Sequence, residues 1–179
     1  MKLDRVVSFL DKWYDIRLLF SPGIYNKFDN SDREYFDELN LKGSKLFYFL
    51  NNYLKYKLED LLGDRFYVCL VFYSEDERGS DLSDKIQLVK ECGINIPSDY
   101  VSVNRYIEDY EVYCNYFFYE ESVDNLSKYI SGTLAIDLME GIPRLPCDAF
   151  YIKRDMTKVV NVYDDRGMDV VNLYSHKII

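Results

Sequence analysis

The sequence predicts an α+β protein with a mostly antiparallel sheet of about four to six strands and helices packed against it. Apolar residues make up 48% of the 179 residues, which is ample for a buried core. Helical and strand patterns alternate irregularly, without the βαβ rhythm of a parallel sheet. The length is typical of a single domain, with a helical part at about 1–63 and a sheet-forming part at about 64–179.

Helices are predicted where apolar residues recur three and four positions apart. The pattern begins at Leu3 and recurs in a long helix, Ser44–Leu62, that Gly63 ends. Shorter helices are expected at Ser31–Leu39 (with a capping box from Ser31 to Glu34), Ser83–Cys92, Val123–Ile130 and Leu134–Met139, the last two separated at Gly132. Beside the apolar face of the long helix runs a second stripe, which we expect to be buried internally: Phe49, Tyr53 and Tyr56.

Strands are predicted where β-branched and aromatic residues gather. The segment Arg65–Tyr73 is apolar on both alternating faces and is expected to be a central strand covered on both sides. The other expected strands are Glu111–Glu121, residues 149–153, residues 158–163 and the segment that follows the turn DDRG.

The turn DDRG is expected to be a type I turn closed by a glycine bulge. Asp164 can accept a hydrogen bond from the backbone two residues on, and Gly167 can adopt a positive φ. This leaves Arg166 and Asp169 unexplained by the turn. A structural ion pair that locks the hairpin is the favoured role for Arg166, and a contact with a partner is the alternative.

Charge argues against a nucleic-acid ligand. Lys and Arg total 22 against 31 Asp and Glu, for a net charge of −9, whereas nucleic-acid binders are usually basic. A basic protein partner would be attracted, and the 18 tyrosines suit a contact surface. Acidity that serves solubility alone is the alternative. The candidate contact residues are Glu75, Asp76, Glu77, Asp81, Glu108, Asp109 and Glu111.

Recognisable catalytic machinery is missing from the sequence. The single histidine, His176, lies four residues from the end, the four cysteines form no CxxC pair, and the glycines form no phosphate-binding loop. We therefore expect no enzyme activity, cofactor or metal. One alternative is a metal-dependent enzyme in which Asp164, Asp165 and Asp169 converge with another carboxylate such as Glu120. Another is a regulatory domain with a tyrosine-lined pocket for a small molecule.

Targeting signals are also missing from the sequence. The first residues carry charges every few positions, and no long uncharged apolar run occurs, so we expect neither a signal peptide nor membrane contact but a cytoplasmic location.

The C-terminal block Tyr163, Asp164, Asp165, Arg166, Gly167 and Asp169, followed by Val170 and Val171, resembles the signature YDDRGxD of a family of small, uncharacterised bacterial proteins. The preceding PRLPCDAFYIKRDMTKVVNVY resembles the strand pair of that family. Its small acidic members look like immunity proteins of polymorphic toxin systems. The resemblance implies a cytoplasmic immunity protein that binds and neutralises a cognate toxin domain, commonly a basic nuclease.

Overall fold

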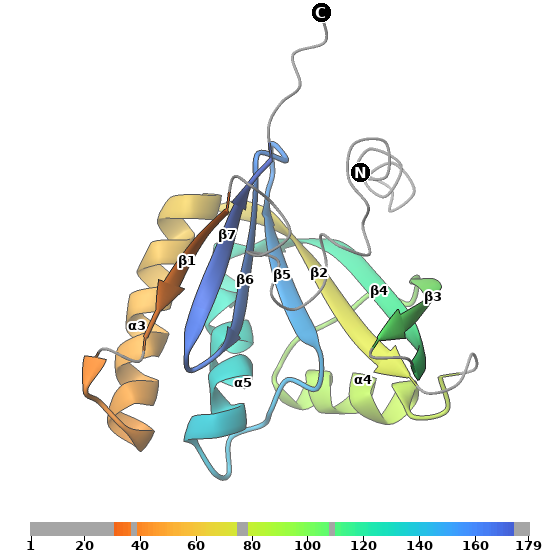
Figure 1. Cartoon of the computed structure of the whole chain (residues 1–179), viewed down its shortest axis with the longest axis horizontal. Coiled ribbons are helices and arrows are strands. Elements are labelled where there is room, and N and C mark those ends of the chain that lie inside the picture. Colours follow the sequence, from red (N-terminus) through yellow and green to blue (C-terminus); the bar gives the residue numbers. More distant parts are fainter. Residues whose placement is uncertain (1–30, 37–38, 75–78, 108–109, 174–179) are drawn as a thin grey trace, which may run out of the picture.

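The computed structural model describes residues 31–36, 39–74, 79–107 and 110–173. It shows one seven-stranded sheet with three α-helices (Figure 1). The strands are β1 (Ser31–Tyr35), β2 (Arg65–Ser74), β3 (Val101–Ile107), β4 (Tyr110–Ser122), β5 (Asp148–Lys153), β6 (Lys158–Asp164) and β7 (Gly167–Asn172). The helices are α3 (Gly43–Leu62), α4 (Leu82–Glu91) and α5 (Leu126–Leu138), with a 3-10 turn η3 (Val123–Asn125) before α5. The predicted α+β class is confirmed, with more strands than expected.

The strands lie in the order β1-β7-β6-β5-β2-β4-β3, and every neighbouring pair is antiparallel. The order places β1, which comes from the N-terminal part of the chain, beside β7 near the C-terminus. β1 and β3 are therefore the outermost of the described strands.

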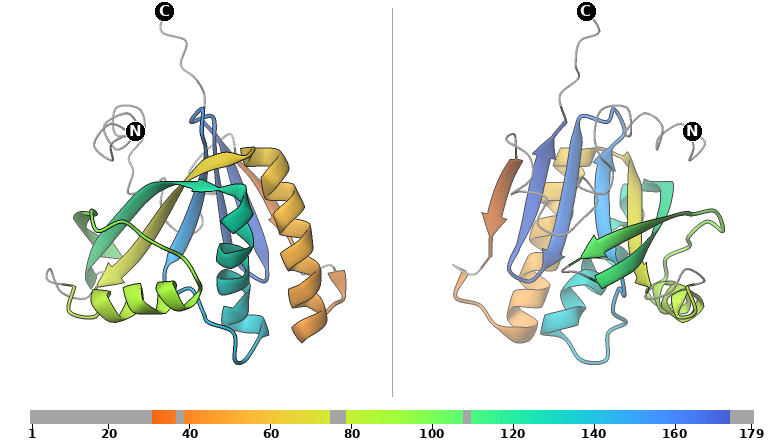
Figure 2. Two further views of the ribbon diagram at one scale, coloured as in Figure 1. Left: turned by 180° about the vertical axis from the view of Figure 1, so that it is seen from behind. Right: turned by 45° about the vertical axis from the view of Figure 1, so that its right-hand side comes forward.

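Both faces of the sheet are buried. On one face, Leu50, Leu54 and Leu58 of α3 pack with strand residues such as Phe66 and Phe72. Helices α3, α4 and α5 all lie on this side (Figure 2). The other face has its own apolar cluster: Tyr67, Cys69, Val71, Cys114, Tyr116, Phe118, Phe150, Ile152, Val159, Val171 and Leu173. As predicted, β2 is a central strand covered on both sides.

Four local predictions need correction, and the first concerns the N-terminal edge. Ser31–Tyr35 forms strand β1 and not the start of a helix, because it pairs with β7 along its whole length. The helical part at 1–63 thus contributes a strand to the sheet. The amphipathic pattern that begins at Leu3 lies outside the described residues.

The predicted break at Gly132 is wrong as well, because α5 continues through it. A Cβ at this position would lie 3.1 Å from Leu145 Cβ and 3.3 Å from Cys92 Sγ. The glycine therefore permits close packing against two other segments and does not end the helix.

The other two corrections concern a strand and one side of a helix. The strand β3 was not predicted, because its sequence VSVNRYI mixes polar and apolar residues, and its pairing with β4 stabilises it. Burial of the second stripe of α3 is wrong for two of its three members: Phe49 is 42% exposed and Tyr56 is 71% exposed, whereas Tyr53 packs against the core. None of the helices in the described ranges combines the length and apolarity that a membrane crossing requires.

Candidate functional site

The turn between β6 and β7 is held by Asp164, as the sequence predicts. Its Oδ1 accepts a hydrogen bond from the backbone N–H of Arg166 at 2.8 Å. Its Oδ2 accepts from Arg166 Nε at 2.7 Å, and this ion pair locks the two-residue turn. The carboxylate raises the pKa of the exposed Arg166 guanidinium, chiefly through that hydrogen bond.

Gly167 has a different role from the predicted glycine bulge. Its φ is not positive, and the extra residue in the ladder is Tyr163, between Val162 and Asp164. A Cβ on Gly167 would lie 2.3 Å from Tyr163 Oη and 2.5 Å from the carbonyl oxygen of Glu34 in β1. The glycine is needed because β1 and the tyrosine ring both approach the backbone closely.

Asp169 is fully buried and binds an arginine that the sequence analysis did not single out. Arg33, directly opposite on β1, donates from Nε to Oδ1 at 2.7 Å and from Nη2 to Oδ2 at 2.9 Å. The guanidinium lies 5.3 Å from the centre of the Tyr163 ring and 5.8 Å from that of Tyr35. The hydrogen bond with Asp169 raises the pKa of Arg33, despite its partial burial.

These contacts give the C-terminal block a common structural role. Tyr163, Gly167 and Asp169 contact β1, while Asp164 and Arg166 shape the turn beside it. The backbone N–H of Phe36 also donates to the carbonyl oxygen of Arg166 at 2.8 Å. The block therefore holds β1 against β7.

Three carboxylates do meet at this turn, but not the predicted set. Carboxylate oxygens of Asp137, Asp164 and Asp165 lie within 4.8 Å of one another, a spacing that can accommodate a cation. Partial burial raises the pKa of Asp165, and the negative charges of Asp137 and Asp164 add to that shift. Asp164, however, already pairs with Arg166.

The other two residues of the proposed carboxylate site lie elsewhere. Asp169 pairs with Arg33, and Glu120 on β4 lies 3.1 Å from Arg65 Nε and 3.3 Å from Arg154 Nε. The metal-dependent alternative requires Asp169 and Glu120 to converge with Asp164 and Asp165. In the described part of the chain they do not, so this prediction is wrong.

The predicted acidic contact residues follow the ends of β2 and β3 in the sequence, and the end of the sheet where these two strands finish is here called the acidic end: Glu75, Asp76, Glu77, Asp81, Glu108, Asp109 and Glu111. Glu75, Asp76, Glu77, Glu108 and Asp109 lie outside the described residues, as does the side chain of Glu111. Their flanking residues are described. Ser74 at the end of β2 lies opposite Tyr113, while Ile107 and Tyr110 close the β3–β4 pair. Ser74, Ile107 and Tyr110 thus lie at the same end of the sheet.

Helix α4 lies at this end too (Figure 1). Asp81, just before α4, pairs with Lys85 at 2.5 Å, and this hydrogen bond lowers the pKa of Asp81. Asp81 therefore stays charged at neutral pH.

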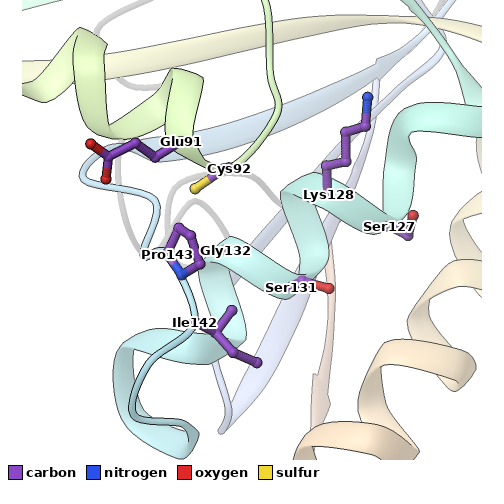
Figure 3. Close-up of a pocket in the computed structure, with 8 residues that line it drawn as sticks. All are labelled: Glu91, Cys92, Ser127, Lys128, Ser131, Gly132, Ile142 and Pro143. Carbon is purple, nitrogen blue, oxygen red and sulfur yellow. The ribbon is translucent and has the colours of Figure 1, made fainter.

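A cavity of about 270 Å³ lies between the end of α4, α5 and the segment around Pro143 (Figure 3). It contains the thiol of Cys92, but burial raises the pKa of that thiol, and the charge of Glu91 adds to the effect. Ser131 donates to Asn51 at 2.7 Å, and Lys128 to Asn125 at 2.7 Å. The lining thus lacks the lowered thiol pKa that activates a cysteine nucleophile.

A second cavity of about 220 Å³ is lined in part by Tyr119 and Tyr129. The two hydroxyls lie 2.8 Å apart, and Tyr129 also donates to Glu121 at 2.8 Å. Glu121 in turn accepts from Asn125 at 2.9 Å. The tyrosines are thus bonded within the protein, so the cavity gives little support to a small-molecule site.

Comparison with known proteins finds no family model, no curated protein and no solved structure that matches this chain.

Proposed function

We propose that the protein is a cytoplasmic immunity protein that binds and neutralises the toxin domain of a bacterial competition system, with a basic nuclease domain as its cognate partner. The acidic end is the proposed contact surface. The observation that carries the proposal is the strand register, which places the residues that flank two acidic stretches of the sequence, Ser74 and the pair Ile107 and Tyr110, at one end of the sheet.

The mechanism follows from charge. A nuclease holds phosphate with arginine and lysine side chains, and a cluster of carboxylates can occupy those cations. Opposite potentials also accelerate the encounter. Leu88 on α4 is exposed and can add apolar contact.

The resemblance of the C-terminal block supports the same proposal in a different way. Its residues contact β1 and shape the turn beside it, so the block stabilises the fold. The proposed contact surface lies on other strands. Its residues can therefore differ between members with different partners while the C-terminal block stays the same.

The test is co-purification with the C-terminal toxin domain encoded next to this chain, followed by binding measurements. We expect a stable complex that blocks the nuclease activity of that domain. The variant Glu75→Lys/Glu77→Lys/Glu108→Lys/Asp109→Lys should weaken binding at least about tenfold, chiefly through a slower on-rate.

The matched control reverses four acids beside the opposite end of the sheet, where β2 begins: Asp60→Lys/Asp64→Lys/Asp124→Lys/Asp155→Lys. The two variants have the same net charge. A difference in their affinity for the toxin domain therefore shows that the location of the reversed acids matters. Equal binding by both variants would remove the acidic end as the contact surface, and failure of the domain to bind the unaltered chain would overturn the proposed function.

A further inference from the structure

The sheet face opposite the helices is buried, although none of the described helices covers it. Its apolar cluster contains side chains from β2, β4, β5, β6 and β7. Val71, Phe150 and Val159 of this cluster are fully buried, whereas α3, α4 and α5 lie on the other side of the sheet (Figure 2). Side chains stand roughly perpendicular to a sheet, so their neighbours on the same face shield only their flanks. The face therefore needs a cover that the described helices do not supply.

Polar side chains on this face are closed to water as well. Asn161 and Asp169 alternate with apolar residues of the cluster and are 1% and 0% exposed. Cys114, Tyr116 and Phe150 take part in further polar, electrostatic or ring interactions, so none of them is without a partner. Water is thus excluded along the strands from β4 to β7.

Composition identifies the segment that can cover this face. Outside the described ranges, the internal segments 37–38, 75–78 and 108–109 consist entirely of charged residues. Residues 174–179 contain three apolar side chains, whereas residues 1–30 contain fifteen. Covering an apolar face requires apolar surface on the covering segment too. Residues 1–30 have the composition that this role requires.

The N-terminal segment also has a suitable position and length. It joins β1 at Ser31, which lies opposite Val171 of the buried face. The face extends over the five adjacent strands from β7 to β4, about 19 Å at ordinary strand spacing. The apolar pattern from Leu3 to Tyr14 predicts a helix of twelve residues, which would be about 18 Å long. One such helix is long enough to cross the face.

We propose that residues 1–30 pack across the sheet face opposite the helices. The apolar side of the predicted helix Leu3–Tyr14 lies against the cluster on β4, β2, β5, β6 and β7. The fold then has three layers, with the sheet between α3, α4 and α5 on one side and the N-terminal segment on the other. Removal of apolar surface from water on both faces stabilises this arrangement. The proposal does not depend on toxin binding.

Two cysteines report on the cover. Cys69 and Cys114 belong to the buried face, whereas Cys92 and Cys147 pack on the helix side, and all four thiols are free. Alkylation of the full chain with N-ethylmaleimide, followed by mass spectrometry, measures the labelling rate of each thiol. Leu10→Asp places a charge on the apolar side of the segment and should accelerate labelling of Cys69 and Cys114 at least about tenfold. The rates at Cys92 and Cys147 should stay within about twofold.

The matched control is Ser8→Asp, which adds the same charge about 160° away from Leu10 around the predicted helix. It should leave all four labelling rates unchanged. Leu10→Ala is a milder change, which keeps the test valid if circular dichroism shows that Leu10→Asp does not fold. It should accelerate the same two thiols to a smaller extent.

Trp13 provides a second measurement, which needs no variant. It is the single tryptophan of the sequence and lies in the proposed cover. We expect acrylamide to quench its fluorescence at least about fivefold less in the folded protein than in urea, because a closely packed ring is shielded from the quencher.

Several outcomes would overturn the proposal. One is quenching of Trp13 that is equally strong in the folded protein and in urea. Another is labelling of Cys69 and Cys114 that neither Leu10 variant accelerates, or that Ser8→Asp accelerates as much as Leu10→Asp. Protection of these thiols that weakens on dilution from about 100 to 1 µM would assign the cover to a second copy of the chain instead.

Discussion

The carboxylate of Asp169 is fully buried, and its bidentate partner Arg33 is 18% exposed. Removing one member of such a pair lowers the stability of the fold strongly, because the other charge stays buried without an opposite charge beside it. The ion pair links residues 136 positions apart, so the native strand pairing is what brings the charges together.

Replacing Arg33 by methionine should lower the free energy of unfolding by about 3–5 kcal/mol, because it leaves Asp169 buried and uncompensated. The double variant Arg33→Met/Asp169→Leu should recover most of the loss. Urea denaturation of both, with the exposed control Lys55→Met, measures the difference. A loss in Arg33→Met no larger than in the control would contradict a stabilising role for the buried pair.

The cluster of Asp137, Asp164 and Asp165 predicts a pH effect. The pKa of Asp165 is higher in the folded protein than in the unfolded chain, so its charged form opposes folding above that pKa. This penalty disappears as the pH falls through the folded-state pKa. The variant Asp165→Asn should therefore be more stable at pH 7, by about 0.5 kcal/mol after solvent screening, and equal to the unaltered protein at low pH.

Thermal unfolding between neutral and acid pH checks this effect. Asp164→Asn is the informative control, because Asp164 holds both the backbone and the side chain of Arg166. That variant should be destabilised at pH 7. A loss of stability in Asp165→Asn at pH 7 would contradict this prediction, because it would show that the charge of Asp165 is attracted by Arg166 more strongly than it is repelled by Asp137 and Asp164.

Among the elements, β1 illustrates how neighbours decide secondary structure. Ser31 and Glu34 have the spacing of a helix capping box, yet the segment is extended. Pairing with β7, the Arg33–Asp169 ion pair and the bond from Phe36 to Arg166 all require the strand form. Local helix propensity amounts to only a few tenths of a kcal/mol per residue, so these tertiary contacts prevail.

Gly167→Ala should loosen β1 from the sheet. The added Cβ overlaps Tyr163 Oη and the Glu34 carbonyl oxygen, and the expected loss of stability is about 2 kcal/mol. Hydrogen exchange should accelerate at the amides of residues 31–36. The control Thr157→Ala, in the β5–β6 turn, should leave that exchange unchanged. Unaltered protection of β1 in Gly167→Ala would mean that the strand does not depend on this close approach.

On the scale of the whole molecule, the arrangement of charge separates two surfaces. The sequence that follows β2 and joins β3 to β4 is rich in acids, whereas β1 and α3 carry no net charge. Long-range attraction should therefore govern the encounter of a cationic partner with the acidic end.

Salt should weaken the proposed association with the toxin domain. Raising NaCl from about 50 to 500 mM shortens the Debye length and should slow binding of the toxin domain at least about tenfold. Stopped-flow kinetics measure the on-rate. An on-rate that stays constant over this range would contradict an encounter governed by charge.

Much of the fold follows from short-range patterns in the chain. The apolar periodicity over Ser44–Leu62 and the strand pattern over Arg65–Tyr73 predict α3 and β2 almost to their ends, and DDRG predicts the position of the last turn. These features are readable because each depends on residues within a few positions of one another.

Only the tertiary structure decided which distant residues meet. It made Ser31–Tyr35 a strand, paired Arg33 with Asp169 and brought Asp137 beside the turn. It also left Phe49 and Tyr56 exposed, although their spacing is equally compatible with burial. The physical reason is that strand order and helix placement set these contacts, and both depend on the free energy of the whole packed sheet.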